Sequence, residues 1–282
     1  MRKIGIGVSD FKDIIEQEYF YVDKTKFIEE ISENGAIVQL ITRPRRFGKT
    51  LNMSMLRYFY DISGKDANRK LFKNLYIENS ATIEEQGKYP VIFISFKDIK
   101  ALTIEEMYSQ VRTLISEIYD NYKFLRENLD ERDRVIFDKI WTEDKSGNYF
   151  NSLKQLAKYL KEYYNQDVIL LIDEYDTPMV SAYENGYYDE IKSFFTGLFG
   201  SALKENPALK KAVLTGIMRI SKENIFSGLN NIRVNTILES DFSQYFGLTE
   251  KEVENSLVEY GLEARLDEVQ KWYNGYIFGG VR

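Results

Sequence analysis

The chain has 282 residues, 44% hydrophobic and 29% charged, with a net charge of −6; this balance is typical of a folded globular protein and disfavours a general polyanion binder. It contains no cysteine and no histidine, which excludes disulfides, thiolate or imidazole catalysis, and zinc or haem sites. Any metal must therefore be bound by oxygen ligands, as Mg²⁺ prefers, and any base must be a carboxylate, lysine or tyrosine.

The segment from Met1 to Asp10 lacks an apolar signal core, and no window approaches 18 apolar residues. We therefore expect a cytoplasmic protein with no membrane partner. The length exceeds the roughly 100–200 residues usual for one domain, so we expect one large domain or a domain with an appendage.

Short apolar runs without alternation occur along the chain, as is typical of strands buried on both faces. They cover residues 37–41, 91–94, 168–172 and 212–214. Segments with helical spacing separate them, for example residues 104–118 and 191–202. This alternation predicts an α/β fold with a mainly parallel sheet flanked by helices.

The strand pattern weakens after about residue 221, and a helix is predicted to begin at Thr249, where Glu252 three residues later completes a capping box. We expect a nucleotide-binding domain over residues 1–220 and a smaller, mostly helical lid or linker subdomain over residues 221–282.

The most specific segment follows the first predicted strand and reads Arg43-Pro-Arg-Arg-Phe-Gly-Lys-Thr50 before a helical stretch. A strand, a loop ending in Gly-Lys-Thr and a helix are typical of a phosphate-binding loop, whose backbone N–H groups and helix dipole favour a polyphosphate. Lys49 would reach the β- and γ-phosphates, and the Thr50 hydroxyl would bind Mg²⁺.

The first glycine of the pattern G-x-x-x-x-G-K-[ST] is replaced by Arg43. With Arg45, Arg46 and Lys49, this residue would place four cations around one anion site. A solvated basic turn between a strand and a helix is the alternative interpretation.

The third apolar run ends in Asp173-Glu174, a pattern typical of a Walker B segment. Asp173 would hold Mg²⁺, and Glu174 would polarise the attacking water. An ordinary acidic strand cap is the alternative, but a phosphate-binding loop on the first strand favours the Walker B interpretation.

A third element follows the fourth predicted strand. In additional-strand ATPases, a polar residue at the end of the strand between the two Walker strands contacts the γ-phosphate, and a nearby arginine stabilises the transition state. Thr215 and Arg219 fit these places, with a turn threonine and a surface arginine as the alternative. The guanine-reading sequence Asn-Lys-x-Asp is absent, which favours adenine.

Several segments together resemble the bacterial AAA-ATPase-like domain proteins, whose members often carry a C-terminal PD-(D/E)XK nuclease-like domain. The matching segments cover residues 21–25, 43–56, 171–176, 215–219, 225–230 and 272–276. Arginine at the first glycine position of the loop is itself typical of this family.

The resemblance implies an AAA-type or STAND-like P-loop core that uses ATP with Mg²⁺. It also implies a contact with the nucleotide base from the segment before the first strand, here Tyr21, Asp23 and Thr25. The candidate residues of the phosphate-binding loop are Arg43, Arg45, Arg46, Phe47, Gly48, Lys49, Thr50 and Leu51.

In the family, the nuclease half would follow a segment such as Trp272-Tyr-Asn-Gly-Tyr276. The sequence stops at Arg282, so we expect a truncated or short version and expect no nuclease activity from it.

The sequence favours an ATP-binding module with slow Mg²⁺-dependent hydrolysis, acting as the regulatory or motor part of a larger protein. A nucleotide-binding switch without useful turnover is one alternative. A nucleic-acid contact through the cations of residues 43–49 is another, although the acidic net charge opposes it. The oligomeric state and any action of Arg219 on a neighbouring subunit stay open.

Overall fold

The computed structural model describes residues 1–218, 226 and 231–272. Within these residues, a five-stranded parallel sheet has the order β2-β3-β4-β1-β5. The strands are β1 (Val38–Thr42), β2 (Val91–Ser95), β3 (Val168–Asp173), β4 (Leu209–Gly216) and β5 (Ile232–Asn235). The predicted α/β class and its parallel sheet are confirmed.

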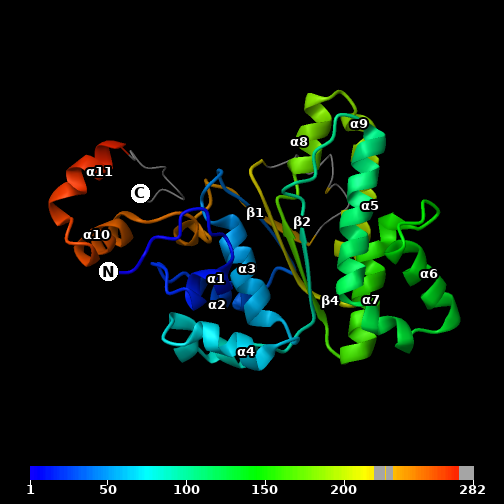
Figure 1. Cartoon of the computed structure of the whole chain (residues 1–282), viewed down its shortest axis with the longest axis horizontal. Helices are drawn as coiled ribbons and strands as arrows, with labels where there is room; N and C mark the ends of the chain where they lie inside the picture. The colour runs from blue at the N-terminus through cyan, green and yellow to red at the C-terminus, as the bar shows by residue number, and fades with distance from the viewer. Residues whose placement is uncertain (219–225, 227–230, 273–282) are drawn as a thin grey trace.

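Helices cover both faces of the sheet (Figure 1). One face carries α1 (Phe11–Glu16), α2 (Lys26–Glu33), α3 (Lys49–Tyr60) and α4 (Lys65–Arg69). The other face carries α5 (Ile104–Asn121), α6 (Glu131–Trp141), α7 (Ser152–Tyr164), α8 (Thr177–Glu184) and α9 (Tyr188–Leu203). Short 3₁₀ helices connect these elements: η1 (Lys70–Phe72), η2 (Tyr76–Asn79), η3 (Ala81–Glu85), η4 (Lys123–Asn128), η5 (Tyr149–Asn151), η6 (Ser243–Tyr245) and η7 (Glu263–Arg265).

The alternation of side chains along each strand divides the apolar core between the two faces. In β3, Leu170 and Ile172 pack with α5, α7 and α9, whereas Ile169 and Leu171 pack with the α3 side. This period of two places the side chain of Asp173 on the α3 side, at the carboxyl end of the strand. The same alternation brings Thr215 of β4, two residues after Val213, to that side.

The strand β4 lies between β1 and β3. This order confirms the expectation that the strand ending at Thr215 separates the strand before the loop from the strand ending at Asp173. The strand β5 was not predicted, because it is a short edge strand of four residues, Ile-Arg-Val-Asn, in which polar residues interrupt the apolar ones.

The helices α10 (Glu250–Glu259) and α11 (Leu266–Trp272) lie at one end of the molecule (Figure 1). The structure describes both helices in full and finds no buried residue in either. The predicted capping box between Thr249 and Glu252 is present. By contrast, β5 pairs with β1, so this part of residues 221–282 lies with the main sheet. The division into two domains at residues 220 and 221 stays a prediction.

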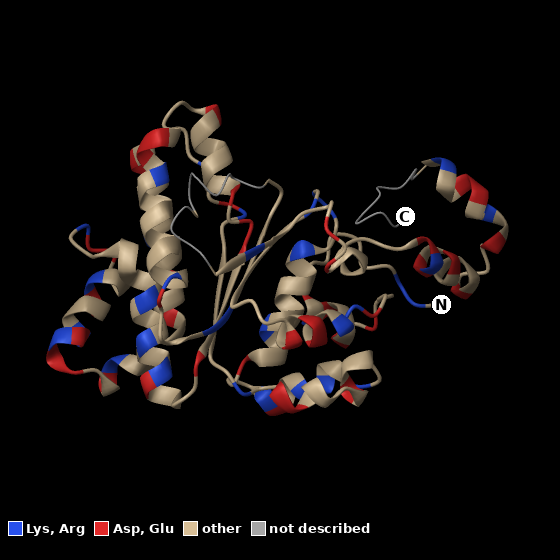
Figure 2. Ribbon diagram, turned by 180° about the vertical axis from the view of Figure 1, so that it is seen from behind, with Lys and Arg blue, Asp and Glu red and all other residues tan. Residues whose placement is uncertain are grey.

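Charged residues lie mainly on the helices and loops around the sheet (Figure 2). Among the described residues, no helix combines the length and the apolar character needed to cross a membrane.

Candidate functional site

The carboxylate of Asp173 joins three elements at the carboxyl end of the sheet. The Thr50 Oγ1 hydroxyl at the start of α3 donates to Asp173 Oδ2 at 2.8 Å. Thr215 Oγ1, at the end of β4, donates to Asp173 Oδ1 at 2.5 Å. Asp173 and Thr215 have no exposed surface. The structure thus brings together three of the predicted site residues. Asp173 and Thr215 lie at the carboxyl ends of neighbouring parallel strands, and Thr50 lies at the start of the helix that follows β1.

The loop between β1 and α3 ends in a backbone shape suited to an anion. Gly48 is the N-cap of α3 and has a φ of 76°, a region that glycine enters without strain. Because glycine has no side chain to cap the helix, the first N–H groups of α3 are left to other acceptors. Arg46 also has a positive φ, 67°, so two turns of the chain shape this loop.

The ammonium group of Lys49 is directed back into the loop. Its Nζ donates to the carbonyl oxygens of Arg43 at 3.1 Å and of Pro44 at 3.0 Å. Burial lowers the pKa of Lys49, while the negative charges of Glu174, Asp173 and Asp176 oppose this shift. The ammonium group therefore lies within the loop, where a polyphosphate would compete with the two carbonyl oxygens for it.

Glu174 follows Asp173 in a left-handed backbone conformation, with a φ of 50°. Such a conformation is uncommon for a residue with a side chain. It is fixed on one side by the Tyr175 N–H, which donates to Thr215 O at 3.0 Å. On the other side, Thr177 Oγ1 donates to Glu174 Oε2 at 3.3 Å. The residue is half-buried, and its negative charge acts to raise the pKa of Lys49 against the effect of burial.

The structure does not bring the Arg43 side chain to the anion site. This guanidinium is fully buried at the edge of the sheet and donates to the carbonyl oxygens of Thr42, Asn235 and Asp241 at 2.9, 2.8 and 3.3 Å. Burial lowers the pKa of Arg43, and the charge of Glu239 opposes the shift. The expected group of four cations is therefore reduced to Arg45, Arg46 and Lys49.

The remaining loop residues divide by exposure. Arg45 and Arg46 are exposed, whereas Phe47 and Leu51 are half-buried and pack against the core on the α3 side. Phe47 and Leu51 can contribute backbone N–H groups, and the two arginines can contribute charge.

The three residues inferred from the resemblance to contact the base have structural partners. The Tyr21 hydroxyl lies 3.4 Å from Met55 Sδ of α3. Asp23 Oδ1 accepts from the Thr25 N–H at 2.8 Å, and Thr25 Oγ1 accepts from the N–H of Ile77 in η2 at 3.1 Å. These bonds fasten the turn before α2 to η2, and the contact with a base stays a prediction.

Sequence reasoning missed a connection between the segment after Glu174 and the turn after β4. Asp176 Oδ2 accepts from the N–H groups of Ile217 at 2.9 Å and Met218 at 2.8 Å. The Tyr175 hydroxyl donates to Met218 O at 2.7 Å. The continuation of Asp-Glu into Asp-Glu-Tyr-Asp was the available signal. Arg219, the predicted transition-state arginine, lies outside the described residues.

The residues present fit Mg²⁺ and a polyphosphate. Mg²⁺ prefers hard oxygen ligands, and the hydroxyl of Thr50 and the carboxylate of Asp173 could both serve as such ligands. Their oxygen atoms lie 2.8 Å apart. Lys49 and the glycine-capped start of α3 supply the charge and the N–H donors that a phosphate chain requires.

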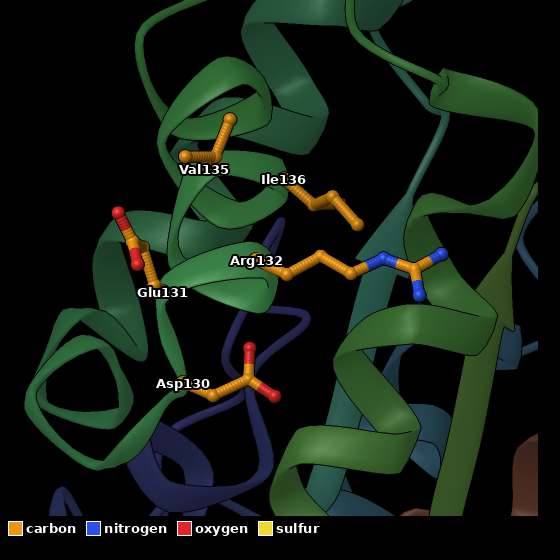
Figure 3. A pocket seen from close by; sticks show the side chains of 5 residues that line it. All are labelled: Asp130, Glu131, Arg132, Val135 and Ile136. Atoms are coloured by element: carbon orange, nitrogen blue, oxygen red, sulfur yellow. The ribbon is translucent and has the colours of Figure 1, made fainter.

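A shallow surface hollow of about 590 Å³ lies elsewhere, at the start of α6 (Figure 3). It is lined by Asp130, Glu131, Arg132, Val135 and Ile136. The hollow lies on the face of the sheet opposite α3, and none of the predicted site residues lines it.

The fold and the loop together define the class of protein. A parallel sheet with a phosphate-binding loop between β1 and α3, and with acidic residues at the end of β3, is a P-loop NTPase-like core.

The chain belongs to the predicted AAA-ATPase family, whose model matches residues 5–226. It is also 28% identical over 282 residues to an uncharacterized protein in the vnfD 5′ region of Azotobacter chroococcum mcd 1. The match covers 99% of the chain and 49% of that relative, so the chain spans about half of the relative's length.

Proposed function

We propose that the chain binds ATP with Mg²⁺ at the loop between β1 and α3 and hydrolyses it slowly. The observation that carries the proposal is the Asp173 carboxylate, which accepts hydrogen bonds from Thr50 at 2.8 Å and from Thr215 at 2.5 Å. It links the start of the loop helix, the acidic strand end and the intervening strand, and this supports a common site for Mg²⁺ and a polyphosphate.

Each residue has a separate part in this proposal. Lys49 and the N–H groups of residues 48–51 would hold the β- and γ-phosphates, and Thr50 and Asp173 would hold Mg²⁺. A bound Mg²⁺ would neutralise charge on the phosphate oxygens. Glu174 would accept a proton from the attacking water while the bond between the γ-phosphorus and the bridging oxygen breaks, and Thr215 would orient that water.

The proposal is tested by Mg²⁺-ATP binding and phosphate release in the unmodified protein and two variants. Lys49→Ala is expected to lower ATP affinity by at least about tenfold, because a charge-assisted contact with the phosphates is lost. Glu174→Gln is expected to retain binding and to lower phosphate release by about 10²–10⁴-fold. Equal ATP binding by the unmodified protein and Lys49→Ala would refute the proposal.

A nucleotide-binding switch without useful turnover is the second candidate. It is favoured by the hydrogen bond from Thr177 Oγ1 to Glu174 Oε2 at 3.3 Å, which engages one oxygen of the carboxylate needed as the base. In this case ATP still binds, but Glu174→Gln leaves the residual phosphate release unchanged.

We further propose that this nucleotide site regulates or drives another part of a longer protein. The support is the length of the Azotobacter relative, of which the match covers about half. To test this role, the chain would be purified together with its natural downstream sequence. The activities of that longer protein would then be compared with and without ATP.

A further inference from the structure

Arg43 connects the beginning of the phosphate-binding loop to a segment almost 200 positions later in the sequence. Its Nη1 donates to Asn235 O and its Nη2 to Asp241 O. The guanidinium also lies 5.3 Å from the ring centroid of Phe246, within range of a cation–π interaction. We call residues 235–247 the bracket segment.

The bracket segment also contacts the other end of the loop. The Gly247 N–H donates to Phe47 O at 3.1 Å. Gly247 has a φ of 81°, and a β-carbon there would lie 2.8 Å from the Phe47 ring, so this approach requires glycine. One turn into α3, Asn52 Nδ2 donates to Tyr245 O at 2.8 Å. The loop is thus held by the bracket segment at both of its ends.

The bracket segment is itself anchored in the core. Phe242 and Phe246 are buried and each lies 5.4 Å from the Phe27 ring of α2 in an edge-on arrangement. Phe242 has a φ of 59°, which is unusual for a bulky side chain and persists only when the surroundings determine it. A loop fixed to this segment is therefore fixed to the body of the protein.

We propose that Arg43 is a positioning residue that holds the phosphate-binding loop in its binding-competent shape by joining it to the bracket segment. The inference rests on the proposed ATP binding, and it assigns to Arg43 a role that needs no contact with ATP. It also makes the bracket segment, which leads directly into α10, sensitive to occupancy of the loop.

The direction of the coupling follows from the contacts of Lys49. In the structure its ammonium group binds the carbonyl oxygens of Arg43 and Pro44, the first two residues of the loop. A polyphosphate competes for this ammonium group, so its binding would weaken the hydrogen bonds from Lys49 to these two carbonyl oxygens. The bracket segment would still hold the loop at both of its ends. A bound ligand therefore makes the bracket segment more ordered, and an ordered bracket segment favours ligand binding, so the coupling is reciprocal.

The first test measures ATP affinity in two substitutions. Arg43→Gly restores the glycine of the usual loop pattern but removes every side-chain bond to the bracket segment, and it is expected to weaken ATP binding by about tenfold or more. Arg43→Lys keeps a positive charge without the planar fork and is expected to give an intermediate loss. The matched control is Arg233→Gln. This change removes a 2.6 Å ion pair between the exposed Arg233 and Asp241 of the bracket segment, and it is expected to leave ATP affinity unchanged.

The second test needs no substitution and therefore does not depend on variant folding. Amide hydrogen exchange is followed in the unmodified protein with and without Mg²⁺-ATP, and slower exchange is expected in the bracket segment as well as in the loop. Protection confined to the loop, or full ATP affinity in Arg43→Gly, would overturn the inference while leaving the proposed function intact. Absence of ATP binding by the unmodified protein would overturn both.

Discussion

Gly216 shows how closely the chain packs beside the candidate site. It ends β4 where the segment after Glu174 crosses the strand, and its carbonyl oxygen accepts from the Arg43 N–H at 3.0 Å. A β-carbon at this position would lie 2.6 Å from the Tyr175 ring and 2.7 Å from Asp176 Oδ1. The absence of a side chain therefore lets β4 and the acidic segment approach each other.

The substitution Gly216→Ala is expected to destabilise the fold by about 1–3 kcal/mol, because Tyr175 and Asp176 are buried and cannot move aside without losing their bonds to residues 217 and 218. The measurement is the free energy of unfolding in urea. Gly200→Ala is the control, since a β-carbon there meets nothing within 4 Å in the helix α9. We expect that change to stabilise by about 0.5–1 kcal/mol, and equal effects of the two substitutions would contradict the argument.

At the scale of elements, α10 is fastened to the body of the protein by a partly buried ion pair. Lys24, just before α2, is 8% exposed in its side chain and lies 2.6 Å from Glu252 of α10. Burial lowers the pKa of Lys24, and the hydrogen bond and charge of Glu252 oppose the shift. Because α10 buries no residue of its own, its attachment depends on contacts such as this pair.

We expect Glu252→Gln to loosen α10, with local opening made easier by about 1–3 kcal/mol, because a mostly buried lysine loses its counter-charge. Glutamine can still accept the N–H of Thr249 in the capping box, so the change isolates the ion pair. Amide hydrogen exchange of residues 250–259 measures the effect. The exposed Glu254→Gln on the same helix is the control, and similar exchange in both variants would speak against the proposed attachment.

At the scale of the whole molecule, buried titratable groups predict how stability changes in alkaline solution. Burial raises the pKa of Tyr21, Tyr60 and Tyr119 above 10.0. Lys211 shows the opposite effect: burial lowers its pKa to about 8, and its ammonium group donates to the carbonyl oxygen of Asn34 at 2.7 Å.

Lys211 and the tyrosines change the free energy of unfolding in opposite directions, over different ranges of pH. Between about pH 8 and 10.5 the unfolded chain retains the Lys211 proton that the folded chain has lost, so this residue makes stability rise with pH. Above pH 10 the unfolded tyrosines lose protons that the folded ones retain, so stability falls by about 1.4 kcal/mol per pH unit for each such tyrosine. Because several tyrosines act together, we expect a steep loss above pH 10.

Urea unfolding at a series of pH values from 7 to 11 would measure this curve. Lys211→Met is expected to remove the rise between pH 8 and 10.5, whereas the exposed neighbour Lys210→Met is expected to retain it. A rise that persists in Lys211→Met would show that another group produces it.

The sequence predicted the elements whose pattern is local. Apolar runs identified β1 to β4, because parallel strands covered on both faces contain few polar residues. The sequence also predicted Asp173 at the end of a strand and Thr50 at the start of a helix, and therefore predicted that both lie near the loop between β1 and α3. It missed β5, because the four residues of this edge strand include Arg233 and Asn235 and form no apolar run.

The sequence by itself therefore determined the α/β class and the place of Asp173 and Thr215 near strand ends and of Thr50 at a helix start. The strand order, which only the tertiary structure shows, brings these three side chains together. Only the tertiary structure decided the place of Arg43, since its acceptors at Asn235 and Asp241 are supplied by residues 192 and 198 positions away. The same holds for Asp176, whose carboxylate meets the N–H of Ile217 41 positions later. Hydrogen bonds between distant segments depend on packing, which no local pattern records.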